Sequence, residues 1–599
     1  MNFSSLPLRL LSKKNILISR MLVLTLPLLF HPLAVAAERS AKAAALSYFN
    51  TQLGVQYVGS KACAQCHADI YREYMQTAMG RSMVPPGDAP DFPAAPVIIQ
   101  SEKLQRQFEV FRKDGALYQS EFEVDASGND VFRDTQRIAY IMGAGQNGIG
   151  YLVQKGNYLF EAPLTYYTRS RSWGLSPGYE LADYGFLRPV PEACIVCHSG
   201  RALPVENRPG LYQNPAFEQL AIGCENCHGP GQLHVEQRLK GSPLRGADLS
   251  IVNPVRLPSW LADNTCMMCH QAGDTRILQP GKSYADFRPG APLDQTVAIF
   301  AAPFTPASPP RSPLLQHYEL MILSRCYRAS LRTGKIMSCI TCHDPHFQPP
   351  AAQAPAYYRK KCLICHTERS CTLALAARLR QSDNCIGCHM PQQHLERIAH
   401  SALTNHRIIA HPGEPFPQAA FEQTTSALLD LVQVDAAPGA RTAPPDIVLF
   451  QAYGELMSKN PAYKSRYEKL LDQLASSQPR SPVILSALAR RALAGGTPGD
   501  LTAAKDKLSQ AINEGSTLDS DYDLESQLLD RSGETAEAIS ILKRGIALNP
   551  YSPRLYKRLA LLYIRARDYG DALGVMKQEI KIYPEDSFMR MLIQRAEKM

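Results

Sequence analysis

The sequence has no long hydrophobic run after its first 37 residues, so we expect no membrane-spanning helix in the rest of the chain. The first 37 residues begin with basic side chains and no acids, and continue with an apolar stretch, 21–37, that prolines interrupt. This order predicts a secretory signal that is removed on export. The alternative is an uncleaved membrane anchor. No cysteine lies near the predicted cleavage site, which argues against lipid attachment there.

Tryptophan is also scarce. The 599 residues include two tryptophans but 45 prolines. A chain of this length forms two or more domains. The composition fits a core that is filled partly by something other than aromatic side chains.

Cysteine, by contrast, is placed regularly. The 16 cysteines include seven C-x-x-C pairs, and a histidine follows every pair directly, although the chain has only 15 histidines. The motifs are CAQCH, CIVCH, CENCH, CMMCH, CITCH, CLICH and CIGCH. Zinc sites and disulfides use C-x-x-C pairs but do not require the next residue to be histidine. Covalent haem attachment requires all three residues, two for thioether bonds and one as an axial iron ligand.

The motifs therefore predict seven covalently bound c-type haems, with zinc sites or disulfides as the weaker alternatives. The predicted attachment residues are Cys63, Cys66, Cys194, Cys197, Cys224, Cys227, Cys266, Cys269, Cys339, Cys342, Cys362, Cys365, Cys385 and Cys388. The predicted proximal iron ligands are His67, His198, His228, His270, His343, His366 and His389. Haem propionates offset the formal charge of +9, so the charge gives no reason to expect nucleic acid binding.

Strands are expected in residues 92–190, which contain no C-x-x-C pair. The stretch "FEVFRKDGALYQSEFEV" predicts a hairpin that turns at Asp114-Gly115, and "IGYLVQKGNYLFEAPLTYY" predicts a second one. The stretch "GAGQNG", 143–148, matches a dinucleotide fingerprint, but β-type residues follow it where that fingerprint needs a helix. We therefore expect a glycine-rich turn between strands.

Residues 191–411 hold six motifs in expected loops and short helices, and a Pro/Ala-rich linker is expected within 413–445. Residues 446–599 are predicted to be helical and repetitive. Ala538 and Ala572, and likewise Pro550 and Pro584, are 34 residues apart, which is the tetratricopeptide period. The expected fold is thus mainly α with a β-rich insertion: a haem-packed domain, 38–412, followed by a helical solenoid. The alternative for the C-terminal part is a set of unrelated amphipathic helices.

Seven histidines of the mature chain remain outside the motifs: His234, His317, His346, His394, His400, His406 and His411. Seven spare imidazoles for seven irons predict mostly bis-histidine coordination. His394 and His411 are the ones most typical of plain surface residues. Two cysteines, Cys326 and Cys371, also remain, and a disulfide between them is expected in an exported protein.

The chain resembles the exported multihaem c-type cytochromes that end in tetratricopeptide repeats, the cytochrome c-552/4-like family. The matching stretches are "YVGSKACAQCHADIYREYMQTAMGRSM", "NYLFEAPLTYYTRSRSWGLSPGY", "CENCHGPG…H", "SRCYRAS…SCITCHDPH" and "CIGCHMP…H…TNHRI". The resemblance implies that His234, His346, His400 and His406 are distal iron ligands. Relatives often carry a histidine where this chain has Met79, so a His/Met haem or an open iron is implied there. His317 completes the set of predicted distal ligands.

These features predict a periplasmic heptahaem cytochrome that carries electrons between redox partner proteins, with the repeats as a docking surface. The first alternative is an oxidoreductase that acts on nitrite or hydroxylamine at an open iron. The family is distantly similar to pentahaem nitrite reductases, but those carry a C-x-x-C-K motif that this chain lacks. The second alternative is a redox-sensing scaffold.

Overall fold

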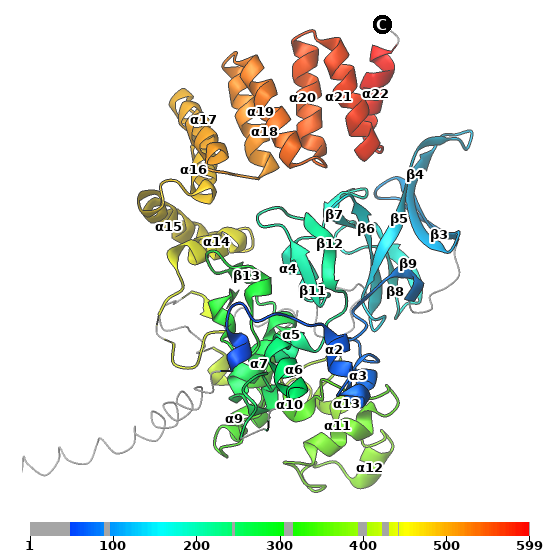
Figure 1. The fold of residues 1–599 in the computed structure, drawn as a ribbon, viewed down its shortest axis with the longest axis vertical. Coiled ribbons are helices and arrows are strands. Elements are labelled where there is room, and N and C mark those ends of the chain that lie inside the picture. Colours follow the sequence, from blue (N-terminus) through cyan, green and yellow to red (C-terminus); the bar gives the residue numbers. More distant parts are fainter. Residues whose placement is uncertain are drawn as a thin grey trace, which may run out of the picture.

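The computed structural model describes residues 48–88, 96–241, 243, 246–304, 316–392, 404–421, 430–440 and 442–597. The predicted signal segment, His394 and His400 lie outside these residues. Figure 1 shows a row of helices across the top, a β-sheet region below it, and a lower part of short helices and loops. In the described part of the chain, no helix combines the length and the apolarity needed to cross a bilayer.

The largest sheet has ten strands, and its paired strands are antiparallel. Its main path runs β10-β7-β6-β5-β4-β3-β2, with β1 beside β5 and with β8 joining β6 to β9. The strands are β1 (Met83–Val84), β2 (Val97–Ser101), β3 (Arg106–Lys113), β4 (Ala116–Val124), β5 (Asp130–Met142), β6 (Gly148–Lys155), β7 (Tyr158–Glu161), β8 (Leu164–Tyr167), β9 (Ser172–Leu175) and β10 (Arg188–Pro189).

Both predicted hairpins are confirmed. Strands β3 and β4 turn at Asp114 and Gly115, which have φ values of 51° and 76°, as the two-residue turn of a twisted hairpin requires. Strands β6 and β7 pair next to Gly156. The stretch 143–148 connects β5 to β6, so the prediction of a glycine-rich turn is confirmed as well.

The expected helical repeat part is present, but the structure holds more strand than the prediction of one β-rich insertion allows, because strands also occur outside that insertion. A two-stranded sheet joins β11 (Arg201–Pro204) and β12 (Tyr212–Gln219), and a three-stranded sheet joins β13 (Thr275–Leu278), β14 (Val297–Ala301) and β15 (Val432–Gln433). The last strand lies inside the segment expected to be a linker. There Leu431 is fully buried, and Val434 donates a backbone hydrogen bond to Ile299. Part of 413–445 is therefore fixed structure rather than linker.

The C-terminal part is a series of antiparallel helices. They are α14 (Asp446–Leu456), α15 (Lys464–Ser477), α16 (Pro482–Gly495), α17 (Pro498–Asn513), α18 (Asp519–Arg531), α19 (Thr535–Leu548), α20 (Pro553–Arg565), α21 (Tyr569–Ile582) and α22 (Ser587–Ala596). Helices α18, α20 and α22 begin 34 residues apart, as do α19 and α21. Ala504, Ala538 and Ala572 share one position of this period and are all buried. The predicted tetratricopeptide-type solenoid is confirmed as a helical repeat.

The loops between repeats fix the solenoid to the largest sheet. Tyr551, in the loop before α20, packs edge-on against the rings of Tyr158 and Phe160 of β7, at centroid distances of 5.1 and 5.2 Å. Thr517, in the loop before α18, donates a hydrogen bond to the Asn207 carbonyl. The docking thus uses one edge of the solenoid. The first helices of successive pairs, such as α18 and α20, contact each other along its inner side.

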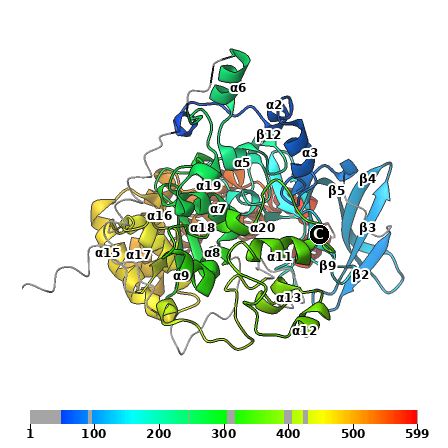
Figure 2. The ribbon, with the colours of Figure 1, turned by 90° about the horizontal axis from the view of Figure 1, so that it is seen from below.

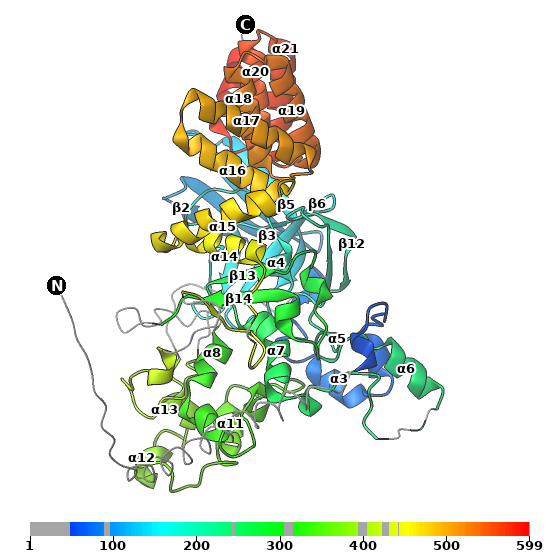
Figure 3. The ribbon, with the colours of Figure 1, turned by 90° about the vertical axis from the view of Figure 1, so that its left-hand side faces the viewer.

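The motif-bearing part consists of short helices. They are α2 (Ser60–Ala64), α3 (Ala68–Tyr74), α4 (Glu192–Ile195), α5 (Glu225–His228), α6 (Gln232–Leu239), α7 (Ser259–His270), α8 (His317–Ile322), α9 (Arg325–Ser330), α10 (Cys339–Cys342), α11 (Ala354–Cys362), α12 (Leu375–Leu379) and α13 (Cys385–His389). In Figures 1 and 3, α11, α12 and α13 lie at the end away from the solenoid, and Figure 2 shows them from below, with α6 projecting at the side.

Candidate functional site

Each motif lies on or beside a helical turn, and this conformation brings its three chemical groups to one face. In the first motif the His67 amide donates to the Cys63 carbonyl at 2.9 Å, and His228, His343 and His366 make the same bond in their motifs. In a helical turn, residues three and four positions apart point to the same side. Both thiols and the imidazole of one motif can therefore reach one flat group.

Six of the seven motifs line one continuous cavity of about 3650 Å³. A site for a small organic ligand measures about 300–1,000 Å³, and protein interiors do not keep empty space of this size. The turn 143–148 also lines the cavity, as do Met79 and Arg81. Cys63, Cys66 and His67 of the first motif do not line it.

One long segment of the motif-bearing part has no core of buried hydrophobic side chains. Among the described residues between Leu323 and Ile409, no hydrophobic side chain is buried. Several large ones are instead exposed there, including Ile364 at 68% and Leu379 at 60%. Five described helices, α9 to α13, lie in this part, and none contains a buried residue. Helices this short are not stable without a packed face, so the segment lacks the apolar contacts that would order it.

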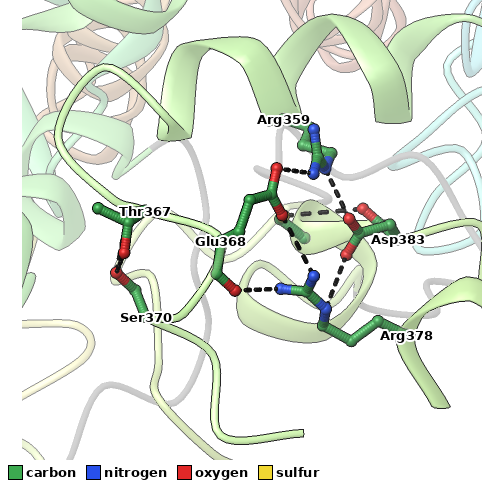
Figure 4. A network of polar contacts seen from close by, with 7 residues as sticks. Arg359, Thr367, Glu368, Ser370, Arg378 and Asp383 are labelled. Atoms are coloured by element: carbon green, nitrogen blue, oxygen red, sulfur yellow. Dashed lines mark hydrogen bonds and ion pairs between the residues drawn. The ribbon is translucent and has the colours of Figure 1, made fainter. Parts of the chain in front are cut away.

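Polar contacts hold the sixth and seventh motifs together (Figure 4). Arg359 of α11 donates to Asp383 at 2.6 Å and also bonds Glu368. Arg378 of α12 reaches the Glu368 carbonyl at 2.9 Å and lies 3.4 Å from Asp383. Asp383 directly precedes Asn384, whose side chain caps α13 by accepting from the Gly387 amide. This network ties the helix before one motif to the helix that carries the next.

Cysteines of different motifs lie next to one another. Hydrogen bonds between thiols join Cys63 to Cys224, Cys269 to Cys197 and Cys266 to Cys339, and the thiols of Cys227 and Cys266, Cys342 and Cys365, and Cys362 and Cys385 are close enough to interact electrostatically. Read in order, these contacts connect all seven motifs into one series, with the second motif as a branch at the fourth. Neighbours in the series therefore share an interface.

Three motif histidines face a histidine from elsewhere in the chain. The ring centroids are 6.5 Å apart for His67 and His234, 5.9 Å for His228 and His346, and 6.3 Å for His343 and His406. In each pair the ring planes lie within 28° of parallel. A metal ion about 2 Å from each nitrogen would set two facing imidazole centres roughly 6 to 6.5 Å apart. These distances fit the group that the motifs predict.

Hydrogen bonds fix the orientation of these imidazoles. Nδ1 of His228 donates to the Val252 carbonyl at 2.8 Å, and Nδ1 of His406 donates to the Thr404 carbonyl at 2.9 Å. A carbonyl oxygen only accepts, so the proton is on Nδ1 and the free Nε2 can bind a metal. Nδ1 of His234 contacts the Asp248 carboxylate at 3.1 Å.

Burial keeps several of these rings neutral. It lowers the pKa of His270 to about 4 and that of His406 to about 3, and neighbouring imidazoles add to the effect. Burial is also the main reason why the pKa values of His228, His317 and His343 are lowered. Neutral imidazole is the form that coordinates a metal.

The other predicted ligands are placed differently. His317 does not face a single motif histidine: its ring lies 5.4 Å from His270 and 4.5 Å from His406, edge-on to both. Met79 lies after the end of α3 and lines the cavity, and its role as a ligand stays a prediction. The expected disulfide is not formed, because Cys326 and Cys371 are both free thiols. Cys326 instead lies near Cys365.

Some contributors could not be identified from sequence patterns. Asp248, Val252 and Thr404 orient imidazoles, and Tyr358 lies 3.2 Å from Nδ1 of His343. Backbone carbonyls carry no residue signature, so the sequence gives no signal for two of these partners.

No protein-family model matches the chain, and no curated protein matches it. Similar solved structures include MamA, which is 20% identical over 25% of this chain and 81% of its own, with a TM-score of 0.22. A TPR protein from Thermus thermophilus is 19% identical over 26% of this chain and 82% of its own, with a TM-score of 0.21. YrrB is 13% identical over 25% and 76%, with a TM-score of 0.22. These TM-scores are too low to support an argument about the fold. The assignment of a helical repeat therefore depends on the 34-residue spacing of the helices described above.

Proposed function

We propose that this protein is an exported electron carrier that binds seven haems covalently through its C-x-x-C-H motifs and docks a redox partner on its solenoid. The main support is the missing core. Between Leu323 and Ile409 the described residues bury no hydrophobic side chain, yet three motifs are held there around a large cavity. Porphyrin faces would supply the apolar contacts that this segment lacks.

The donor set agrees with such a group. The cysteines of each motif provide the thioether sulfurs, and the motif histidine provides the proximal nitrogen. His234, His346 and His406 are the proposed distal ligands to the irons held by His67, His228 and His343. Haem, when bound, supplies one-electron oxidation and reduction.

The chain's own contribution is to position the groups and keep them apart from water. Carbonyl contacts hold the imidazoles in one tautomer, and burial keeps them uncharged. The series of neighbouring motifs keeps successive sites adjacent, which suits transfer of electrons along the molecule. Paired imidazoles leave no open position at these irons, which favours a carrier over an enzyme.

The solenoid is the proposed docking surface. The described contacts with the strands lie at the loop edge of the repeats and at Arg590 of α22, so the side lined by the first helices of the other pairs, such as α18 and α20, is the proposed surface for a partner. Phe588 and Met591 of α22 are 40% and 37% exposed, so the end of the solenoid also offers apolar side chains to a partner.

Mass spectrometry and electron paramagnetic resonance of the exported protein, made in a host with working cytochrome maturation, test the proposal. We expect a mass increase equal to seven haems and oxidised spectra dominated by low-spin iron. The bare chain mass would overturn the proposal. A high-spin signal that shifts with nitrite or hydroxylamine would indicate an enzyme instead.

A further inference from the structure

Three carboxylates from distant segments meet where the solenoid docks on the sheet. Glu121 lies on β4, Asp183 lies in the loop before β10, and Glu585 lies in the loop between α21 and α22. One carboxylate oxygen of each lies within 4.8 Å of the other two. Glu121 is 1% exposed and Glu585 is 4% exposed. Within the described residues this is the one group of three such side chains close enough to hold a metal ion.

Three of the buried oxygens of this cluster lack hydrogen-bond donors, whereas Oδ1 of Asp183 accepts from the Gly185 amide at 3.1 Å. Neither oxygen of Glu121 has a hydrogen-bond partner, and Oε1 of Glu585 has none either. Arg106 is the nearest cation, but its Nε lies 3.6 Å from Glu121 and 3.5 Å from Asp183, and this Nε makes no hydrogen bond. Those distances are too long for a good hydrogen bond. Burying carboxylates in this state is costly, so the site lacks a group that would contact all three.

The backbone makes room for the cluster. Gly185 has a φ of +51°, and a Cβ built on it would lie 1.7 Å from Oε1 of Glu585. Only glycine allows this carboxylate to enter. The fold therefore admits the third carboxylate where an ordinary residue would exclude it.

The charges nearby leave a deficit of positive charge. The three carboxylates carry −3 when ionised, and Arg106 supplies +1, which leaves −2. The other cations are engaged with acids outside the cluster: Lys155 of β6 lies 3.9 Å from Asp134, and Arg590 of α22 lies 3.8 Å from Glu123. Tyr583 lies beside Asp183, Tyr179 and Glu579 are further titratable neighbours, and Arg106 is shared with Glu123 at 3.1 Å. One divalent cation balances this deficit.

We propose that Glu121, Asp183 and Glu585 bind a calcium ion that joins the solenoid to the β-sheet. Carboxylate oxygens are hard ligands, and calcium accepts an irregular set of six to eight oxygens, whereas magnesium demands a near-octahedral one. Burial and the neighbouring carboxylates raise the pKa of Glu121, and burial raises the pKa of Glu585 to about 8. Protons therefore compete with the ion, and binding strengthens as the pH rises.

Calorimetric titration of the full-length exported protein tests this site. After treatment with a chelator, calcium chloride is added at a pH above about 8, where Glu585 is ionised. We expect one ion per chain and a higher melting temperature on binding. Glu121→Gln should weaken binding by roughly tenfold or more, since removing even an outer-shell partner of a metal costs about 10–100-fold. In calcium-free buffer at the same pH the variant should melt at least as high as the wild type, because glutamine replaces a buried carboxyl group whose ionisation is unfavourable.

Glu123→Gln is the matched control. Glu123 lies on the same strand and contacts Arg106 and Arg590, but it is outside the cluster. The control should bind calcium as the wild type does. Equal affinity in the wild type and in Glu121→Gln would place the ion elsewhere and overturn the proposal. Stabilisation by acid with no response to calcium would show that protons alone neutralise the cluster, which also overturns it. Neither result depends on the haem content, so the calcium proposal can be overturned while the proposal of a haem-binding electron carrier stands, and the reverse.

Discussion

The hydrogen bond at Nδ1 of a buried imidazole determines which ring nitrogen is free to bind a metal. A ring whose Nδ1 donates to a carbonyl offers Nε2, and the lowered pKa keeps that nitrogen unprotonated. His228 and His406 meet both conditions. At this scale, spacing and resemblance single out His234, His346 and His406, each of which faces a motif histidine in the structure, and their role as distal ligands stays a prediction. The orienting carbonyls could not be predicted, because a backbone carbonyl carries no signature in the sequence.

Replacing His234 by alanine should remove the ring that faces His67 at 6.5 Å. We expect one low-spin iron signal to be replaced by a high-spin signal, which electron paramagnetic resonance of the oxidised protein measures. Glu236, an exposed residue on the same helix α6, provides the control, and Glu236→Ala should leave the spectrum unchanged. An unchanged spectrum for His234→Ala would mean that another residue serves this iron.

The hairpins show which elements local sequence can specify. The turn at Asp114-Gly115 needs only two residues with positive φ, and the 34-residue period needs only a repeated apolar pattern. Strand β15 is different. It has two residues, and it forms because β14, which lies far earlier in the chain, offers a free edge. The Pro/Ala-rich composition of 413–445 predicted a linker. The sequence around β15 contains no local pattern of a strand, because this strand forms only by pairing with the distant β14.

Gly115→Val should destabilise the β3–β4 hairpin. Space is not the problem, since a Cβ there meets nothing within 4 Å, but a β-branched residue at positive φ costs about 1–2 kcal/mol. The measurement is chemical unfolding followed by far-ultraviolet circular dichroism. Asp114→Asn is the control and should have little effect, because asparagine tolerates this conformation. Equal stability of both variants would contradict the assigned turn.

Across the whole molecule, buried acids make stability depend on pH. Glu579 of α21 is fully buried with no hydrogen-bond partner, and burial together with Asp586 raises its pKa to about 9. The folded state thus holds a proton that the unfolded chain releases near its ordinary pKa. This contribution is complete below about pH 4.5 and is lost as the pH rises towards 9.

Glu579→Gln should therefore reduce the fall in melting temperature between about pH 6 and about pH 9. Differential scanning calorimetry at several pH values measures it, with calcium held constant. Asp472→Asn, at a largely exposed position of α15, is the control and should follow the wild-type curve. If the variant and the wild type lose stability in parallel, the buried carboxyl is not the cause.

Strand β15 precedes α14 in the chain, the apolar face of α14 packs on β13 and β14, and the far repeats are anchored on the largest sheet. The helical array is thus secured at two separate places. A partner protein that binds the helical repeats therefore cannot rotate them relative to the rest of the molecule. The distance and the angle at which a bound partner meets the motif-bearing part are consequently set by the fold before any encounter takes place.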